Sequence, residues 1–207
     1  MKVNAELFIE RLDKVELINE IIFIGGNEPG FVSHIENQIV KNIKKTIDSE
    51  ILDINFKENN IKNFDELTNS QSLFSKHRII KLTNPKDVIV SNIDSLDPQG
   101  FSILINGESL SPSSKIRKFF DGHKKYFSIY CYELSKQFKK KFIESIIKEN
   151  NIVFTDEAYW YFLEKSDDTY RGLEDNIEKI LLLKQSKIDI GVLKKILINS
   201  KNVQMDE

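Results

Sequence analysis

The chain has 207 residues, which is enough for one large domain or two small ones. Hydrophobic residues make up 40% of it and charged residues 30%, a composition typical of globular proteins and not of disordered or fibrous ones. The net charge of −2 provides no overall attraction to nucleic acid or to a membrane, so any such contact needs a local patch.

Two kinds of site are disfavoured by the residues present. The single cysteine, Cys131, excludes an internal disulfide and a cysteine-based zinc site, and its apolar surroundings predict a buried thiol. The histidines His34, His77 and His123 lack the spacing of metal ligands, so we expect them on the surface and expect no metal and no cofactor. No apolar run is long enough to span a membrane, and the first residues lack the core of a signal peptide. We therefore expect a cytoplasmic protein without a membrane partner.

The first part of the chain alternates short apolar runs with helical patterns. The apolar runs predict strands at 21–24, 51–56, 78–82, 101–105 and 126–132. Helical patterns lie between them, at about 31–46, 64–70, 86–95 and 113–120. Near-continuous apolar strands separated by helices are typical of a parallel sheet covered on both faces. The sequence thus predicts a three-layer α/β domain over residues 1–134, with a five-stranded parallel sheet.

From Ser135 onward the pattern is helical only. Apolar residues recur at helical spacing in four stretches, and Thr155, Thr169 and Asp189 stand where helices would begin. The sequence predicts a small all-helical domain over residues 135–200, followed by a polar tail over 201–207.

The segment between the first predicted strand and the first long helix has the frame of a phosphate-binding loop. Gly25 and Gly30 have the glycine spacing of such a loop. Phe31 stands where the loop needs Lys, and Val32 where it needs a hydroxyl, and an apolar pair neither neutralises a triphosphate nor coordinates Mg²⁺. An ordinary strand-to-helix turn that needs glycine twice also explains the segment, and on this stretch alone it is the favoured interpretation. With either interpretation, we expect no nucleotide hydrolysis.

Other positions of a nucleotide hydrolase are also altered or ambiguous. A nucleotide hydrolase needs acidic residues at the end of its third strand to hold Mg²⁺ and water. The corresponding residues here, 79–84, include none. Asn106 stands where such enzymes place a γ-phosphate sensor, although turn chemistry also explains it. Arg171 is either the phosphate-sensing Arg of a lid domain or part of a surface ion pair with Asp167 or Asp168.

Two further segments each have two interpretations. The run Lys136, Lys139, Lys140 and Lys141 either contacts a phosphate backbone or forms an ordinary solvated helix face. The run Gln71, Ser72, Leu73 and Phe74 places two large apolar residues between polar neighbours, before a strand. Leu73 and Phe74 are then either core residues or a wedge that enters a partner.

Several segments together, in this order and spacing, resemble one protein family. The first is the phosphate-loop frame that lacks its Lys and hydroxyl. The second is 72–74, followed by a basic residue and a strand. The others are 101–110 with 113–116, 130–132 leading into helices, and Asp168 with Glu174 and 177–180. The ordered set covers nearly all of residues 1–200 and is similar to the delta subunit of bacterial DNA polymerase III. That family is the clamp-opening member of the clamp loader.

The resemblance implies an AAA+-like α/β domain followed by a helical lid. It also implies a protein without intrinsic enzymatic activity, in which Leu73 and Phe74, flanked by Gln71 and Ser72, enter an apolar pocket of the sliding clamp. The energy for cycling would come from ATP bound by other clamp-loader subunits. The implied partners are the sliding clamp, those subunits, and primer-template DNA within the complex.

One departure and two rival functions remain open at this point. Members of the family continue into a helical collar domain that assembles the loader, and we expect this chain to lack it, which leaves loader assembly open. One rival is a degenerate nucleotide-binding switch that holds a nucleotide through the backbone of residues 25–30. The other is a DNA-binding module that uses Lys136 to Lys141.

Overall fold

The computed structural model describes residues 1–57, 75–108 and 110–202, with the side chains of 198–202 excepted. The chain divides into two compact units, Met1–Tyr132 and Glu133–Glu207, called unit 1 and unit 2 below. This division falls two residues before the boundary predicted at 134.

Unit 1 contains a six-stranded parallel sheet in the order β1-β6-β2-β5-β4-β3. The strands are β1 (Lys2–Asn4), β2 (Ile21–Gly26), β3 (Ser49–Asn55), β4 (His77–Thr83), β5 (Phe101–Gly107) and β6 (Phe127–Cys131). The prediction of five strands missed β1. That strand has a single apolar residue, Val3, and exists because it pairs with the edge of β6, where Val3 lies opposite Ile129.

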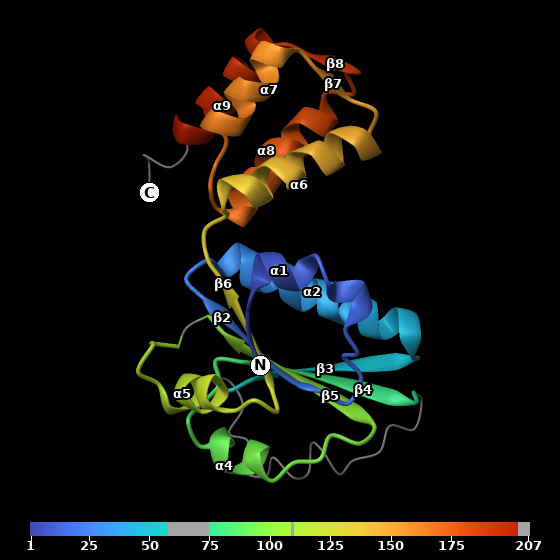
Figure 1. Ribbon diagram of the computed structural model, residues 1–207, viewed down its shortest axis with the longest axis vertical. Coiled ribbons are helices and arrows are strands. Elements are labelled where there is room, and N and C mark those ends of the chain that lie inside the picture. The colour runs from blue at the N-terminus through green and yellow to red at the C-terminus, as the bar shows by residue number, and fades with distance from the viewer. Residues whose placement is uncertain (58–74, 109, 203–207) are drawn as a thin grey trace. The chain divides into compact units, whose positions relative to one another are not determined.

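Helices cover both faces of this sheet, as the prediction of a three-layer domain requires (Figure 1). The helices α1 (Ala5–Ile9) and α2 (Pro29–Thr46) lie on one face, and α4 (Ile89–Asp94) and α5 (Lys115–Gly122) on the other. A short 3₁₀ turn, η1 (Leu12–Lys14), follows α1. The helix predicted at 64–70 lies outside the described residues.

The core of unit 1 is built around its central strands β2 and β5, which are mostly apolar. The central strand β2 is buried along five of its six residues because both of its faces are covered. On the side of α4 and α5, Phe23 stacks on Phe120 with ring centroids 5.3 Å apart. Tyr130 packs at 5.9 Å from the same Phe23 ring. Such aromatic contacts add to the stabilisation from apolar burial.

Unit 2 is mainly helical but not wholly so. Its helices are α6 (Lys136–Glu149), α7 (Asp156–Lys165), α8 (Tyr170–Leu182) and α9 (Ile190–Asn202). Two short parallel strands, β7 (Val153–Phe154) and β8 (Lys187–Ile188), correct the all-helical prediction. With two residues each, they are too short to show a strand period in the sequence, and they form by pairing with each other.

The helix starts predicted in unit 2 are confirmed by their hydrogen bonds. Thr155 accepts from the backbone N–H of Ala158, and Thr169 accepts from that of Gly172. Asp189 accepts from the backbone N–H of Val192 in α9. Each side chain satisfies an N–H group that the helix itself leaves unpaired. None of the helices in the described ranges is both long and apolar enough to cross a membrane.

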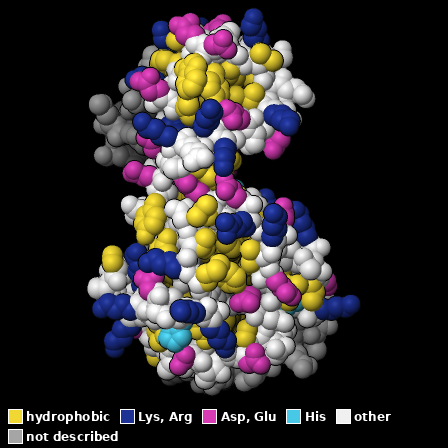
Figure 2. Space-filling model, in the orientation of Figure 1, with side chains coloured by type: hydrophobic (Ala, Val, Ile, Leu, Met, Phe, Trp, Pro, Cys, Tyr) yellow, Lys and Arg dark blue, Asp and Glu magenta, His cyan; other side chains and the backbone are white. Residues whose placement is uncertain are grey.

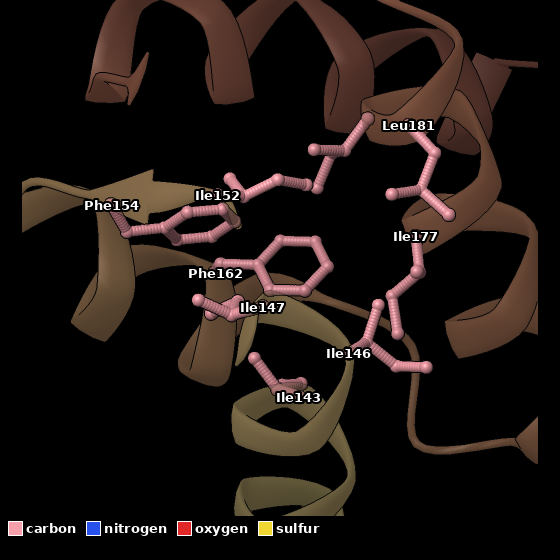
Figure 3. Close-up of a pocket in the computed structure, with 9 residues that line it drawn as sticks. Ile143, Ile146, Ile147, Ile152, Phe154, Phe162, Ile177 and Leu181 are labelled. Atoms are coloured by element: carbon pink, nitrogen blue, oxygen red, sulfur yellow. The ribbon is translucent and has the colours of Figure 1, made fainter. Parts of the chain in front are cut away.

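The interior of unit 2 contains a small apolar cavity (Figure 3). It is lined by Ile143, Ile146, Ile147, Ile152, Phe154, Phe162, Ile177, Ile180 and Leu181, and its volume is about 10 Å³. That is room for about one water molecule, and the apolar lining offers such a water no partner. The cavity is therefore a small packing gap among the apolar side chains of unit 2.

Candidate functional site

The loop between β2 and α2 occupies the position of a phosphate loop. It follows the carboxyl end of β2, which lies between β6 and β5, and it leads directly into α2. A helix N-terminus at this place exposes backbone N–H groups that bind anions in nucleotide-binding proteins. What the loop can bind therefore depends on which group already accepts hydrogen bonds from these N–H groups.

In this chain the carboxylate of Glu28 occupies the start of α2. Its Oε1 accepts from the backbone N–H of Gly30 at 3.2 Å, and its Oε2 accepts from that of Phe31 at 2.5 Å. Glu28 is 4% exposed, so these bonds are formed away from water. A carboxylate here also interacts favourably with the helix dipole. A phosphate would have to displace this carboxylate or lie beside its negative charge, and both are costly.

The two apolar residues at the Lys and hydroxyl positions of a phosphate loop are core residues. Phe31 is 1% exposed and Val32 is 0% exposed. They form the first buried turn of α2, on the same apolar side as Ile35 and Ile39. Neither side chain is placed to contact a ligand, because both are covered by the protein.

Packing, and not phosphate binding, explains the glycines before the helix. Gly26 has a φ of +141°, and a Cβ there would lie 1.8 Å from the carbonyl oxygen of Cys131. That oxygen also accepts from the N–H of Asn27 at 3.1 Å, which holds the loop against β6. A Cβ on Gly25 would meet the ring of Phe23 at 2.8 Å. Gly30 is an ordinary residue of α2. The turn thus needs glycine at 25 and 26, and not at 25 and 30.

A polar cluster lies between α2 and the neighbouring strands. The ammonium of Lys81 in β4 lies 2.6 Å from Glu36 Oε1 in α2 and 3.3 Å from Asp53 Oδ1 in β3. Asn106 in β5 donates to Glu36 Oε2 at 3.2 Å and accepts from the N–H of Glu108 at 3.1 Å. Burial lowers the pKa of Lys81 because desolvation disfavours its charged form.

This cluster places Asn106 in a structural role. Its amide joins the turn after β5 to α2, so the polar residue at the sensor position is already engaged. Glu36 and Lys81 are functional-site neighbours that were not predicted, although the sequence around each residue indicates a partner. Glu36 lies on the buried face of α2, and Lys81 is a half-buried lysine among the apolar residues of β4. Charged groups that are withdrawn from water in this way usually have partners.

The structure corrects one expectation about histidine and confirms the one about cysteine. Of the three histidines expected on the surface, His123 is exposed and His34 is half-buried. His77 is 2% exposed, and its Nε2 lies 2.9 Å from Ser102 Oγ. Burial lowers the pKa of this imidazole. Cys131 is fully buried, and burial raises the pKa of its thiol. Over residues 1–57, 75–108 and 110–202, no group of three acidic, His or Cys side chains is placed to hold a metal ion.

The four lysines that were considered as a basic patch on α6 do not all lie on the surface of the protein. Lys136, Lys140 and Lys141 are exposed, but Lys139 is 2% exposed, which excludes it from a contact with DNA. The Lys139 ammonium donates to the carbonyl oxygen of Ser166 at 2.6 Å and to Asp168 Oδ1 at 2.8 Å. Position 139 lies one helical turn before the buried Ile143, on the inner side of α6.

Replacing Lys139 by Ala is expected to lower the free energy of unfolding by about 2 kcal/mol, because hydrogen bonds to a charged group contribute about 1.5–3 kcal/mol each. Lys140→Ala, on the exposed side of the same helix, is the matched control and should change stability by less than about 0.5 kcal/mol. Urea unfolding of both variants measures the difference. Equal stabilities would contradict the structural role of Lys139.

Two other predicted sites have different outcomes. Gln71, Ser72, Leu73 and Phe74 lie outside the described residues, so their role stays a prediction. Arg171 forms an ion pair 3.0 Å from Asp175, one turn along α8, and not with the two aspartates predicted from the sequence.

The comparisons with known proteins identify the fold. No protein-family model and no curated protein sequence matches the chain. Among solved structures, it is similar to the DNA clamp loader delta protein of Bacillus subtilis, with a TM-score of 0.53, 16% identity, and 92% of this chain and 61% of that one covered. It is also similar to domain III of the replication initiation protein DnaA of Thermotoga maritima, with a TM-score of 0.55, 15% identity and coverage of 94% and 90%.

A third similar structure is the Holliday junction branch migration motor RuvB of Thermotoga maritima, with a TM-score of 0.51, 14% identity and coverage of 93% and 65%. The chain thus spans less than two thirds of the clamp-loader protein and of RuvB. At these identities the likeness concerns the fold. The parallel α/β unit and the mainly helical unit together make this chain a protein of AAA+-like fold.

Proposed function

We propose that this chain is a non-catalytic subunit of a clamp loader, which binds and opens the sliding clamp of DNA polymerase III during DNA replication. The observation that carries the proposal is the phosphate loop in which Glu28 holds the N–H groups of Gly30 and Phe31. An AAA+-like fold with such a loop fits a subunit that depends on ATP bound elsewhere. The likeness to a clamp loader delta protein supports this assignment.

The same loop separates this proposal from the other functions found among the similar structures. A protein motor that is driven by a nucleotide needs a site at which that nucleotide is bound and hydrolysed. Here the anion position is filled by a buried carboxylate, and the positions of the Lys and the hydroxyl carry buried apolar side chains. These features favour a binding role over an energy-consuming one.

The proposed partners follow from this role. The sliding clamp would be bound through Leu73 and Phe74, with Gln71 and Ser72 beside them. Other loader subunits would supply bound ATP, and primer-template DNA would be present in the assembled complex. The chain needs neither a cofactor nor a metal ion for this function.

The direct test measures binding to the sliding clamp of the same organism by surface plasmon resonance. We expect binding by the chain alone, in the absence of ATP. A clamp labelled with a fluorophore pair across one subunit interface would then show increased separation when the chain binds. A chain that does not bind the clamp in either assay would refute the proposal.

A second test concerns nucleotide. We expect no heat of binding when Mg-ATP is titrated into the chain at concentrations up to the high micromolar range, and no phosphate release. The reason is the combined loss of the Lys, the hydroxyl and the free N–H groups. A dissociation constant in the micromolar range would instead support the nucleotide-switch alternative.

A further inference from the structure

The second helix of unit 2, α7, carries a large aromatic side chain on the side that faces the solvent. The buried residues of α7 are Ala158 and Phe162, each 0% exposed. Trp160 lies midway between them in the sequence, and at about 100° of rotation per residue it falls on the opposite side of the helix. It is 60% exposed. Figure 2 shows hydrophobic side chains gathered over α7, with charged side chains around them.

The rest of the described chain leaves most of this indole available to a partner. The ring of Tyr159 meets it edge-on, with 5.3 Å between the ring centroids. Tyr159 is itself held in place, because its hydroxyl donates to Glu144 Oε1 at 2.8 Å. Over the described residues, the N–H of the Trp160 indole donates to no acceptor. The indole therefore offers both a ring surface and a hydrogen-bond donor.

Acidic residues share this side of α7 with the tryptophan. Asp156 and Glu164 lie one helical turn before and one turn after Trp160, and Glu157 lies three residues before it. All three carboxylates belong to exposed residues. Among the described residues, Asp156 and Glu157 have no ion-pair partner, whereas Glu164 lies 2.8 Å from Lys165. We call Asp156, Glu157, Trp160 and Glu164 the α7 acidic-aromatic face.

The needs of the helix explain only part of this face. Carboxylates in the first turn interact favourably with the helix dipole, which accounts for Asp156 and Glu157. The dipole gives no reason for an indole in contact with water. Single exposed apolar residues are common, but tryptophan is also the residue that most often anchors a protein interface. The carboxylates around Trp160 then indicate which kind of partner fits.

The chemistry of this face favours a cation. Among aromatic rings, the indole attracts ammonium and guanidinium groups most strongly when they lie over its face. Carboxylates one turn away attract the same cation, and the aliphatic stem of a lysine or arginine can pack along the ring. The same carboxylates would repel the phosphates of a nucleic acid or of an anionic lipid. Two copies of this chain docked symmetrically through this face would bring their carboxylates together.

We propose that the α7 acidic-aromatic face binds a lysine- or arginine-bearing segment of a partner protein. The cation would lie over the ring of Trp160, between the carboxylates of Asp156 and Glu164. This interaction does not rest on the clamp-opening function, because α7 belongs to unit 2, whereas Leu73 and Phe74 belong to unit 1.

The test uses the whole chain and a fluorescently labelled peptide of about twelve residues in which Arg and Ala alternate. A second peptide, with Glu in place of Arg, is the control probe. Anisotropy at low ionic strength gives the affinity, since salt screens exposed charges. Trp160 is the single tryptophan of the chain, so its own fluorescence reports whether unlabelled peptide reaches the face.

We expect Trp160→Leu to weaken binding of the Arg peptide about threefold, because leucine keeps apolar surface but loses the aromatic ring. D156N/E157Q should lose about fivefold, the effect of two exposed charge pairs. The combined variant W160L/D156N/E157Q should lose about tenfold or more if the effects add.

The matched control is E149Q/E178Q, which removes two exposed carboxylates from α6 and α8. It lowers the negative charge as much as D156N/E157Q and should change the affinity by less than about 1.5-fold, because it leaves α7 intact. Trp160→Leu does not alter the first turn of α7, so it tests the proposal even if D156N/E157Q does not fold.

Four outcomes would overturn the proposal. Equal binding of the Glu peptide would show that the face does not select cations. Unchanged Trp160 fluorescence, or an unchanged affinity of Trp160→Leu, would place the peptide elsewhere on the chain. An equal loss in E149Q/E178Q would assign the binding to net charge alone. Self-association of the parent chain in sedimentation, lost in Trp160→Leu, would assign the face to a second copy.

Discussion

Replacing both Leu73 and Phe74 by Ala is expected to weaken binding to the sliding clamp by about a thousandfold or more. Large apolar side chains that fill a dry pocket each contribute roughly 2 kcal/mol or more to binding, and about 1.4 kcal/mol corresponds to one decade of affinity. The melting temperature of the free chain should stay nearly unchanged, because a wedge that binds a partner contributes little to the core. Clamp affinity and melting temperature are measured on the same preparation.

A matched control removes apolar side chains from another exposed place. Leu182 and Leu183 at the end of α8 are 70% and 40% exposed, so their double replacement by Ala removes a similar amount of apolar surface. We expect this control to bind the clamp as tightly as the parent chain. If Leu73 and Phe74 belong to the core, the first variant will instead lose several kcal/mol of stability. That result, or an unchanged clamp affinity, would refute the wedge hypothesis.

Replacing Gly26 by Ala is expected to lower the free energy of unfolding by about 3 kcal/mol or more. The added Cβ would lie 1.8 Å from the carbonyl oxygen of Cys131, a backbone atom of the residue that pairs with Gly26 in the adjacent parallel strand. A φ of +141° is also a conformation that residues with a Cβ rarely adopt. Relief requires moving β2 away from β6 at the centre of the sheet, which disturbs close packing.

Two other glycines separate the backbone conformation from the close approach. Gly100 has a φ of +80° but open space around it, so Gly100→Ala should cost about 1 kcal/mol. Gly122, the last residue of α5, has open space and no positive φ, so Gly122→Ala should be neutral or stabilise by up to about 1 kcal/mol. Chemical unfolding measures all three. A Gly26→Ala variant no less stable than Gly100→Ala would contradict the close approach of the strands.

The sequence by itself determined the features of this protein that repeat over short distances along the chain. The buried strands of unit 1 and the helices of unit 2 were predicted because apolar residues recur at the period of each element. Thr155, Thr169 and Asp189 were recognised because a cap bonds to N–H groups two or three residues away. The loss of the phosphate-loop residues at Phe31 and Val32 is visible in the same local way.

Only the tertiary structure decided the features that depend on residues far apart in the chain. The strand β1 exists because it meets β6, more than 120 residues later. Lys139 belongs to a buried contact because Ser166 and Asp168 approach it from the loop after α7. Lys81 and Asn106 meet at Glu36 from separate strands. Periodicity reports which side of an element is buried, but not which partner arrives there.

The phosphate loop shows the same limit at the candidate site. Glycine spacing indicated a loop of this kind, yet the glycine under the tightest constraint is Gly26, and the neighbour that constrains it is Cys131 in β6. Glu28 adjoins the helix start in the sequence, but its burial against the N–H groups was decided by the fold around it. A carboxylate can take the place of a bound anion only if it is shielded from water and lies close to N–H donors. Both conditions are met only when the sheet and α2 are assembled.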